Sequence, residues 1–294
     1  MTQVINHKDF DVSEMTGTKP TVRAVNGKDK TVAYMLYKDS PFLLKLPTLY
    51  GPFGASSYNN GNGGTTNNYS LNLSAKGLAV EGKTTDEEVQ EQVKHIFDQL
   101  EEFDKFMISY GLQYSKTIFG KKYDEGKHEA VVEALFTSTV KHGEDKEGNA
   151  YPRRLNTKIR SVYDEPENPN VKVYQTTRTD INDKEFTFDT LTDLITKGTF
   201  VEAVIQPSLW FISGKYGVTW RLVQAKVHKQ KGFGIPLDSV FSDDDDDDDE
   251  VVIQKPVKVV QAVKETECVD SDASDVEEVV AEASGDEDEE VNEV

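Results

Sequence analysis

One stretch of the chain combines positive charge with aromatic rings and contains no acid. From Ala203 to Leu237 there is no Asp or Glu. The stretch holds five cations and five rings, which are Lys215, Arg221, Lys226, Lys229, Lys231, Trp210, Phe211, Tyr216, Trp220 and Phe233. Cations can follow a phosphate backbone while flat rings stack on unpaired bases, at about 1–3 kcal/mol per base. This composition indicates a groove for single-stranded nucleic acid.

The same rings could instead belong to a hydrophobic core. Alternate side chains of a strand face opposite sides, which places Trp220 with Val218 and Leu222 and predicts that this indole is buried. Phe211 and Tyr216 flank a predicted tight turn, so they are the better candidates for stacking. Whether these two rings belong to the core or to the groove stays open.

Two further clusters of positive charge precede this stretch. The segment Asn149–Tyr163 contains no acid, and its cations are Arg153, Arg154, Lys158 and Arg160. A shorter segment, SKTIFGKKY, adds Lys116, Lys121 and Lys122. A single cluster of this kind is usually solvated surface, but three of them in one chain favour a real groove. The predicted nucleic-acid-binding residues are Lys121, Lys122, Arg153, Arg154, Lys158, Arg160, Phe211, Lys215, Tyr216, Arg221 and Lys226.

No residue pattern supports catalysis, a cofactor or a metal. The stretch Asn59–Gly64 (NNGNGG) lacks the Gly-Lys-Ser/Thr ending of a phosphate-binding loop, so a hairpin tip is the simpler interpretation. None of the five histidines pairs with another at the i+3 or i+4 spacing of metal ligands. The run Asp243–Asp249 lacks the glycine and the final glutamate of a calcium loop. We predict a protein that is not an enzyme and needs no cofactor.

Negative charge is concentrated at the C-terminal end. Ser242–Val294 contains 22 acids and three lysines of the chain's 53 and 33, which leaves 31 acids and 30 cations to the 241 residues before it. The segment has no aromatic residue, and such a composition cannot bury enough apolar surface to fold. We predict a nucleic-acid-binding body at 1–241 and a disordered acidic tail at 242–294. A flexible polyanion can compete with nucleic acid for a basic groove.

The single cysteine, Cys268, lies in that tail. No intramolecular disulfide can form from one cysteine, and a reducing compartment is indicated. The first residues show no signal peptide, and no stretch approaches the 18 apolar residues of a membrane helix. We expect a soluble intracellular protein.

The predicted elements place most of the charged clusters on strands. A helix begins at Thr84 or Thr85, each followed three residues later by glutamate, and ends at Gly111; a second helix covers His128–Phe136. Strands are predicted at Thr31–Lys38, Tyr69–Ala75, Val171–Thr177, Phe186–Leu191, Thr199–Gln206, Leu209–Ser213 and Tyr216–His228. The last two flank a tight turn at Gly214-Lys215. This order favours a β-rich α+β fold, an OB-like β-barrel or a curled antiparallel sheet with a helical insertion at about 84–136.

Several blocks occur in a distinctive order along the chain. They are SKTIFGKKY, EAVVEALFTSTVK, NAYPRRLNTKI and IQPSLWFISGKYGVTWRLVQAKV. Over roughly Leu43–Val227 this order resembles a family encoded by nucleocytoplasmic large DNA viruses, the algal-virus and mimivirus-like group. Ile118 stands where the family has Trp, and Arg153 where it has a second Pro. The resemblance implies single-stranded DNA binding through an OB-like barrel ahead of an acidic tail.

These features predict a non-enzymatic single-stranded DNA-binding protein of viral DNA replication, repair or recombination. The expected partners are single-stranded DNA or RNA in the groove and replication proteins on the tail, with no membrane. The expected location is a viral replication site, either a cytoplasmic factory or the host nucleus. Two alternatives stay open. One is an acidic chaperone or virion-packaging protein that binds basic proteins through the tail, and the other is a structural interaction protein whose tail serves solubility.

Overall fold

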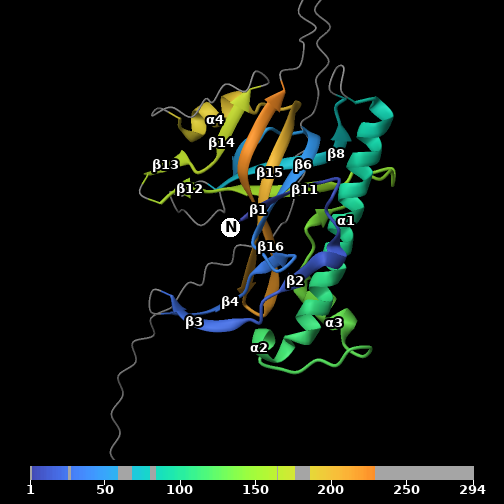
Figure 1. The fold of residues 1–294 in the computed structure, drawn as a ribbon, viewed down its shortest axis with the longest axis vertical. Coiled ribbons are helices and arrows are strands. Elements are labelled where there is room, and N and C mark those ends of the chain that lie inside the picture. Colours follow the sequence, from blue (N-terminus) through green and yellow to red (C-terminus); the bar gives the residue numbers. More distant parts are fainter. Residues whose placement is uncertain are drawn as a thin grey trace, which may run out of the picture. The chain divides into compact units, whose positions relative to one another are not determined.

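The computed structural model describes residues 2–25, 28–58, 68–79, 84–163, 165–175 and 186–228 (Figure 1). Several predictions lie outside these residues. They concern the loop Asn59–Gly64, the basic residues Lys229 and Lys231 with Phe233, the domain boundary after Phe241, and the acidic tail. None of the described helices is long and apolar enough to cross a membrane.

Five strands form a ring at the centre of the fold. In order around the ring they are β6 (Phe42–Gly51), β15 (Thr199–Ile212), β16 (Lys215–His228), β11 (Arg154–Ile159) and β8 (Asn68–Gly77), and β8 pairs again with β6. The ring is closed unevenly, because β15 and β16 pair over nearly their whole lengths whereas β11 meets β16 only at Thr157–Trp220 and Lys158–Arg221. A β-rich fold is confirmed, and its assignment as an OB-like barrel stays a prediction.

Shorter strands extend or flank this ring. They are β1 (Gln3–Asn6), β2 (Met15–Gly17), β3 (Thr21–Val25), β4 (Lys28–Val32), β5 (Met35–Tyr37), β7 (Ala55–Tyr58), β9 (Phe136–Thr137), β10 (Val140–Lys141), β12 (Ser161–Val162), β13 (Glu165–Pro169) and β14 (Lys172–Gln175). β1 pairs in parallel with β6, and β9, β11 and β14 pair in parallel with β16. The predicted antiparallel sheet is therefore wrong, and the sheet is mixed. Parallel neighbours need a long connection, and between β11 and β16 the chain forms four other elements and β15.

The predicted helical insertion is confirmed. It consists of α1 (Asp86–Gln113), α2 (Ser115–Phe119) and α3 (Glu129–Leu135), between β8 and β9. Thr85 caps α1, because its hydroxyl accepts the Glu88 N–H while the Glu88 carboxylate accepts the Thr85 N–H. Gly111 does not end α1 as predicted. Instead, its missing Cβ leaves room for the phenol of Tyr216 against the helix.

One predicted strand in the N-terminal part is divided in the structure. Within Thr31–Lys38, β4 ends at Val32 and β5 begins at Met35. Tyr34 lies between them with its side chain 56% exposed. A continuous apolar run does not reveal where a strand turns outward, so this break could not be predicted.

A second predicted strand, Phe186–Leu191, is wrong. The structure has helix α4 (Phe188–Leu194) here, which begins where the Thr187 hydroxyl accepts the Thr190 N–H. The alternation in FTFDTL is typical of a strand, but the same threonine also serves as an N-cap. The cap and the helical packing of Phe188 and Leu191, both buried, determine the outcome.

β15 and β16 form one long hairpin whose tight turn is confirmed. The turn residues are Ser213 and Gly214, one position earlier than predicted, with φ of 49° and 77°. Two consecutive positive φ values suit the right-handed twist of the flanking strands. The predicted strands Thr199–Gln206 and Leu209–Ser213 are a single strand, β15.

The two faces of this hairpin have different neighbours. Tyr216 and Trp220 face α1, where the Tyr216 hydroxyl donates to the Met107 carbonyl at 3.1 Å. The Trp220 ring lies 5.5 Å from the ring of Phe103, measured between centroids. Because strand residues alternate, Arg221 and its alternate neighbours face away from α1. Figure 1 shows α1 running alongside the hairpin.

Candidate functional site

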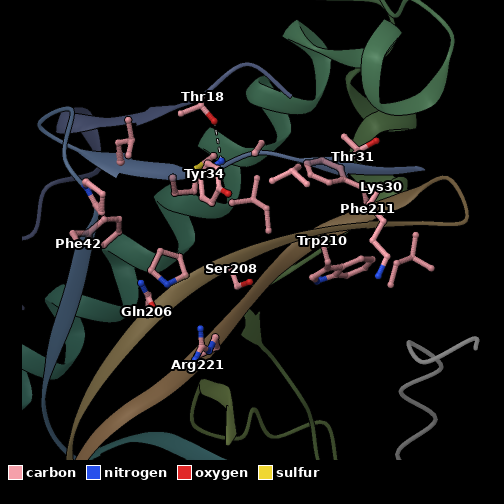
Figure 2. Close-up of a pocket in the computed structure, with 18 of the residues that line it drawn as sticks. Thr18, Lys30, Thr31, Tyr34, Phe42, Gln206, Ser208, Trp210, Phe211 and Arg221 are labelled. Carbon is pink, nitrogen blue, oxygen red and sulfur yellow. Dashed lines mark hydrogen bonds between the residues drawn. The ribbon is translucent and has the colours of Figure 1, made fainter. Parts of the chain in front are cut away.

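A hollow of about 1010 Å³ lies on the hairpin face that points away from α1. Gln206, Ser208 and Trp210 of β15 and Arg221 of β16 line it. Figure 2 shows Tyr34 across the hollow from these side chains. The hollow therefore has a sheet on one side and the connection between β4 and β5 on the other.

The wall that carries Tyr34 is fixed to the helix. The Tyr34 N–H donates to the Thr18 hydroxyl at 2.9 Å, and the Thr18 N–H donates to the Tyr34 carbonyl at 2.9 Å. The hydroxyl of Tyr110 on α1 donates to the Thr18 carbonyl at 2.7 Å. These bonds hold the backbone of Tyr34 in place relative to α1.

A second hollow, of about 1090 Å³, adjoins the first. Lys158, Tyr163 and the stacked rings of Tyr69 and Phe188 line it. Arg160 and Arg221 line both hollows. We call the two hollows together the groove, and the two arginines lie where its halves meet.

The electrostatics of this meeting point favour an anion. Burial, and then the nearby charge of Arg160, lower the pKa of the Arg221 guanidinium below its ordinary value. The Nε of Arg221 is buried and has no hydrogen-bond partner among the described residues. Within that same part of the chain no carboxylate lies within 4.0 Å of Arg160 or Arg221. An arginine stays charged at any physiological pH, so two uncompensated cations face one space.

Acids are present in the groove, but they lie apart from this pair. Asp29 lines the first hollow, and Glu167 and Asp189 line the second. None of the three forms an ion pair with Arg160 or Arg221 in the described structure. The positive centre of the groove therefore stays unneutralised.

Four rings of the groove differ from those of the core in their partners. Among the described residues, Tyr34, Trp210, Phe211 and Tyr163 have no ring partner, whereas core rings such as Phe103 and Trp220 lie against one another. Tyr163 is 98% exposed. Unpaired rings beside cations are what base stacking requires.

The indole of Trp210 has a defined position against the sheet. Its indole lies against Gly217, the residue directly opposite on β16, and a Cβ there would come 2.7 Å from the Trp210 Cζ2. A glycine in a strand often marks such a close approach. Gly217 therefore leaves room for the indole against the sheet, where it also lines the first hollow.

The structure brings part of the predicted site together. Lys158, Arg160, Phe211 and Arg221 all line the groove. Lys215 is exposed at the hairpin turn, where it pairs with Ile212 of the groove lining.

One predicted contact is wrong, and a second predicted residue is held by acids of α1. Tyr216 is fully buried, and burial raises the pKa of its hydroxyl well above the ordinary value, so this ring cannot stack on a base. The Nη1 of Arg153 lies 2.7 Å from an Asp98 oxygen and 3.0 Å from a Glu101 oxygen, both on α1. Its guanidinium also lies over the ring of Phe97, at 5.4 Å from the centroid. Arg153, directly before β11, therefore links this strand to α1, and a phosphate contact by it stays a prediction.

Four other predicted cations lie away from the groove. Lys226 shares Glu202 with Lys45, at nitrogen–oxygen distances of 3.7 and 2.9 Å. Arg154, on β11, lines neither hollow. Lys121 and Lys122 follow α2, where Lys122 lies 3.4 Å from an Asp124 oxygen. A role for these residues in binding stays a prediction.

Sequence reasoning did not select Tyr34, Trp210, Tyr163 and Lys30, all of which line the groove. For Trp210 a signal was present, because strand alternation on the two sides of the predicted turn places it on the face opposite to the buried Trp220. For Tyr34 and Lys30 there was none, because their place depends on how β4 and β5 fold over the sheet.

No family model matches the chain, and no curated protein matches it. Among solved structures, the single-stranded DNA-binding protein from bacteriophage Enc34 in complex with ssDNA has 16% identity and a TM-score of 0.39, over 68% of this chain and 93% of that chain. Gp2.5, a single-stranded DNA-binding protein encoded by bacteriophage T7, has 12% identity and a TM-score of 0.36, over 64% of this chain and 91% of that chain. At these values the likeness transfers neither a ligand nor a residue's role. The resemblance to the viral family stays a prediction.

Proposed function

We propose that this protein binds single-stranded nucleic acid, and DNA in the first place, along the groove and without a catalytic step. The observation that carries the proposal is the pair Arg160 and Arg221, uncompensated by any described carboxylate, at the junction of two hollows. Each hollow has at least one unpaired ring in its lining, Trp210 in the first and Tyr163 in the second. A phosphate at this pair offsets the repulsion between the two guanidinium groups. Bases on either side of that phosphate enter the two hollows.

The rings select single strands over duplex. Trp210 and Tyr34 lie within a space bounded by two walls, and a ring there can stack only on a base that has left its own stack. Such stacking contributes about 1–3 kcal/mol per base and tolerates any sequence. The expected binding is therefore sequence-tolerant, single-strand-selective and sensitive to salt.

The test is fluorescence anisotropy of a labelled 30-mer single strand across a salt series, with duplex as competitor. The full-length wild-type chain is compared with Arg160→Ala/Arg221→Ala. Losing two phosphate contacts should lower the slope of log K against log salt by about 1.4, given about 0.7 per contact for single strands. Lys94→Ala/Lys105→Ala removes two cations from α1 and serves as the charge-matched control. An unchanged slope in the arginine variant, or no binding by the wild type, contradicts the proposal.

We also propose a role for the acidic tail. Its 22 acids favour competition with nucleic acid for the groove and docking of replication proteins. A chain ending at Phe241 should then bind the same 30-mer more tightly than the full-length chain does. Equal affinity would leave the tail without a masking role. The resemblance of the sequence blocks supports placing this activity in viral DNA replication, repair or recombination.

The seven consecutive aspartates favour one competing function, an acidic chaperone or virion-packaging protein for basic proteins. That function needs the tail but not the groove. A pull-down with a histone-like basic protein separates the two functions. A chaperone should bind this protein both as the full-length wild type and as Arg160→Ala/Arg221→Ala. It should lose this binding when the chain ends at Phe241.

A further inference from the structure

β3 and β4 form a two-stranded ribbon that pairs with no other strand in the described structure. The side chains of Thr21, Val22, Arg23 and Ala24 are exposed although they alternate between the two faces of β3. An isolated two-stranded hairpin is marginally stable at best. β3 is therefore exposed on both faces and lacks the covering layer that stabilises the other strands, whereas Thr31 and Val32 at the end of β4 are half-buried.

The ribbon carries like charges directly opposite each other. Arg23 of β3 pairs with Lys30 of β4 in the antiparallel register, so both side chains lie on one face. Both are exposed, and neither has a carboxylate within 4.0 Å in the part of the chain that the structure describes. Like charges directly opposite across two strands are destabilising. Folding alone does not explain this pair, whereas a bound anion would offset its cost.

The ribbon also borders the groove. Lys30, Thr31 and Val32 of β4 line the first hollow. Figure 2 shows Lys30 at the end of the hollow where Trp210 and Phe211 lie. The cationic face of the ribbon is therefore continuous with the wall opposite the sheet, on the far side from Arg221.

We propose that this ribbon is an arm that binds the phosphate backbone of the strand held in the groove. This inference rests on the proposed function and adds a second set of phosphate contacts from the wall opposite the sheet. The sheet binds through Arg160, Arg221 and the rings, and the arm encloses the strand through Arg23 and Lys30. Charge complementarity favours a polyanion over a second copy of the chain, because two ribbons meeting by this face would bring four cations together.

The experiment compares full-length wild type with Arg23→Ala/Lys30→Ala on the 30-mer, by anisotropy over a salt series and by stopped-flow dissociation. Two lost contacts should lower the salt slope by about 1.4, which corresponds to about 25-fold weaker binding at 0.1 M salt. The dissociation rate should rise by a similar factor, because the arm acts after the strand is seated. Both side chains are exposed, and their removal relieves the repulsion between them, so the melting temperature should stay the same or rise slightly. Lys94→Ala/Lys105→Ala again controls for the loss of two charges.

The outcomes separate this inference from the proposed function. An unchanged slope and dissociation rate in the ribbon variant, while Arg160→Ala/Arg221→Ala still weakens binding, overturns the arm and leaves the groove. Absence of binding by the wild type overturns both. A ribbon variant whose DNA-free mass by light scattering differs from that of the wild type would show that the ribbon contacts a second copy, which also overturns the arm.

Discussion

Trp210 and Trp220 lie ten residues apart in the sequence, on opposite faces of the β15–β16 hairpin. Trp220 is 1% exposed and packs beside Phe103 of α1. Trp210 lies on Gly217, has no ring partner among the described residues, and lines the groove. One face of the hairpin is thus packed in the core, while the other lines the groove proposed to bind a ligand.

The difference comes from what covers each face. α1 removes Trp220 from water, and burying a large aromatic side chain is a major contribution to folding. Nothing in the described structure covers the face of Trp210 to the same extent, so its ring and the charge of Arg221 stay available. Substitutions on the two faces should therefore separate stability from binding.

Trp220→Ala should have the largest effect, and it should act on stability. Removing a fully buried tryptophan leaves a cavity beside α1, which costs about 3–5 kcal/mol. Urea unfolding followed by circular dichroism measures this loss. A loss below about 1 kcal/mol would mean that α1 does not hold this face, and the contrast between the faces would disappear.

Trp210→Ala should have the converse effect. Binding of the 30-mer should weaken by about 1–3 kcal/mol, one stacking increment, with little change in unfolding. Wild-type tryptophan fluorescence should be quenched by added single strand, and this quenching should vanish in the variant because Trp220 is buried. Quenching that persists in Trp210→Ala would assign the signal to Trp220 and contradict the contrast.

Gly217→Ala sharpens the same contrast without removing the indole. An added Cβ would lie 2.7 Å from the Trp210 Cζ2, so the indole must move away from Gly217. Binding should lose part of the increment lost in Trp210→Ala. Thr219→Ala, two residues along the same face, is the matched control and should bind like the wild type.

Acid should destabilise the protein through its buried histidines. Burial lowers the pKa of His7, and so does the charge of Lys8, although the hydrogen bond with Gln92 raises it. Burial likewise lowers the pKa of His228, as does the charge of Lys226, although Glu202 raises it. Because these folded-state pKa values lie below 6.5, the unfolded chain takes up protons first as the pH falls through 6.5, and stability is lost there. Each histidine contributes at most about 1.4 kcal/mol per pH unit.

The corresponding measurement is urea unfolding at pH 7.5 and pH 5.5. The wild type should lose roughly 1–2 kcal/mol more than His7→Gln/His228→Gln does over this interval. His95→Gln, at an exposed position on α1, is the control. Equal losses in the wild type and the double variant would exclude the two buried histidines as the cause.

The sequence allowed prediction of the elements whose signals are local. The capping box at Thr85, the spacing of apolar residues along α1 and the two-residue turn of the hairpin are each contained in a few neighbouring positions. The burial of Trp220 followed from alternation with Val218 and Leu222. Arg160 and Arg221 were selected individually from the absence of nearby acids.

What could not be predicted depends on contacts between distant segments. Arg153 looked like a phosphate contact until α1 placed Asp98 and Glu101 beside it. Tyr34 became part of the groove because Thr18, sixteen residues earlier in the chain, holds its backbone. The parallel pairing of β11 with β16 brought the two arginines together, and no local pattern encodes that register.

Tyr216→Phe should have the smallest effect of these substitutions. It also tests why the prediction of Tyr216 as a stacking ring was wrong. The sequence offered Tyr216 as a stacking ring, but the structure places its hydroxyl 3.1 Å from the Met107 carbonyl in the core. Removing one buried hydrogen bond should cost about 1 kcal/mol of stability, and affinity for the 30-mer should not change. Phe211→Leu, at the directly opposite position on β15 and so on the same face, is the paired variant. Phe211 packs against the core while it also lines the first hollow, so this variant should lower stability and weaken binding less than Trp210→Ala does. Weaker binding by Tyr216→Phe at unchanged stability would return this ring to the groove and reverse the assignment of the two faces.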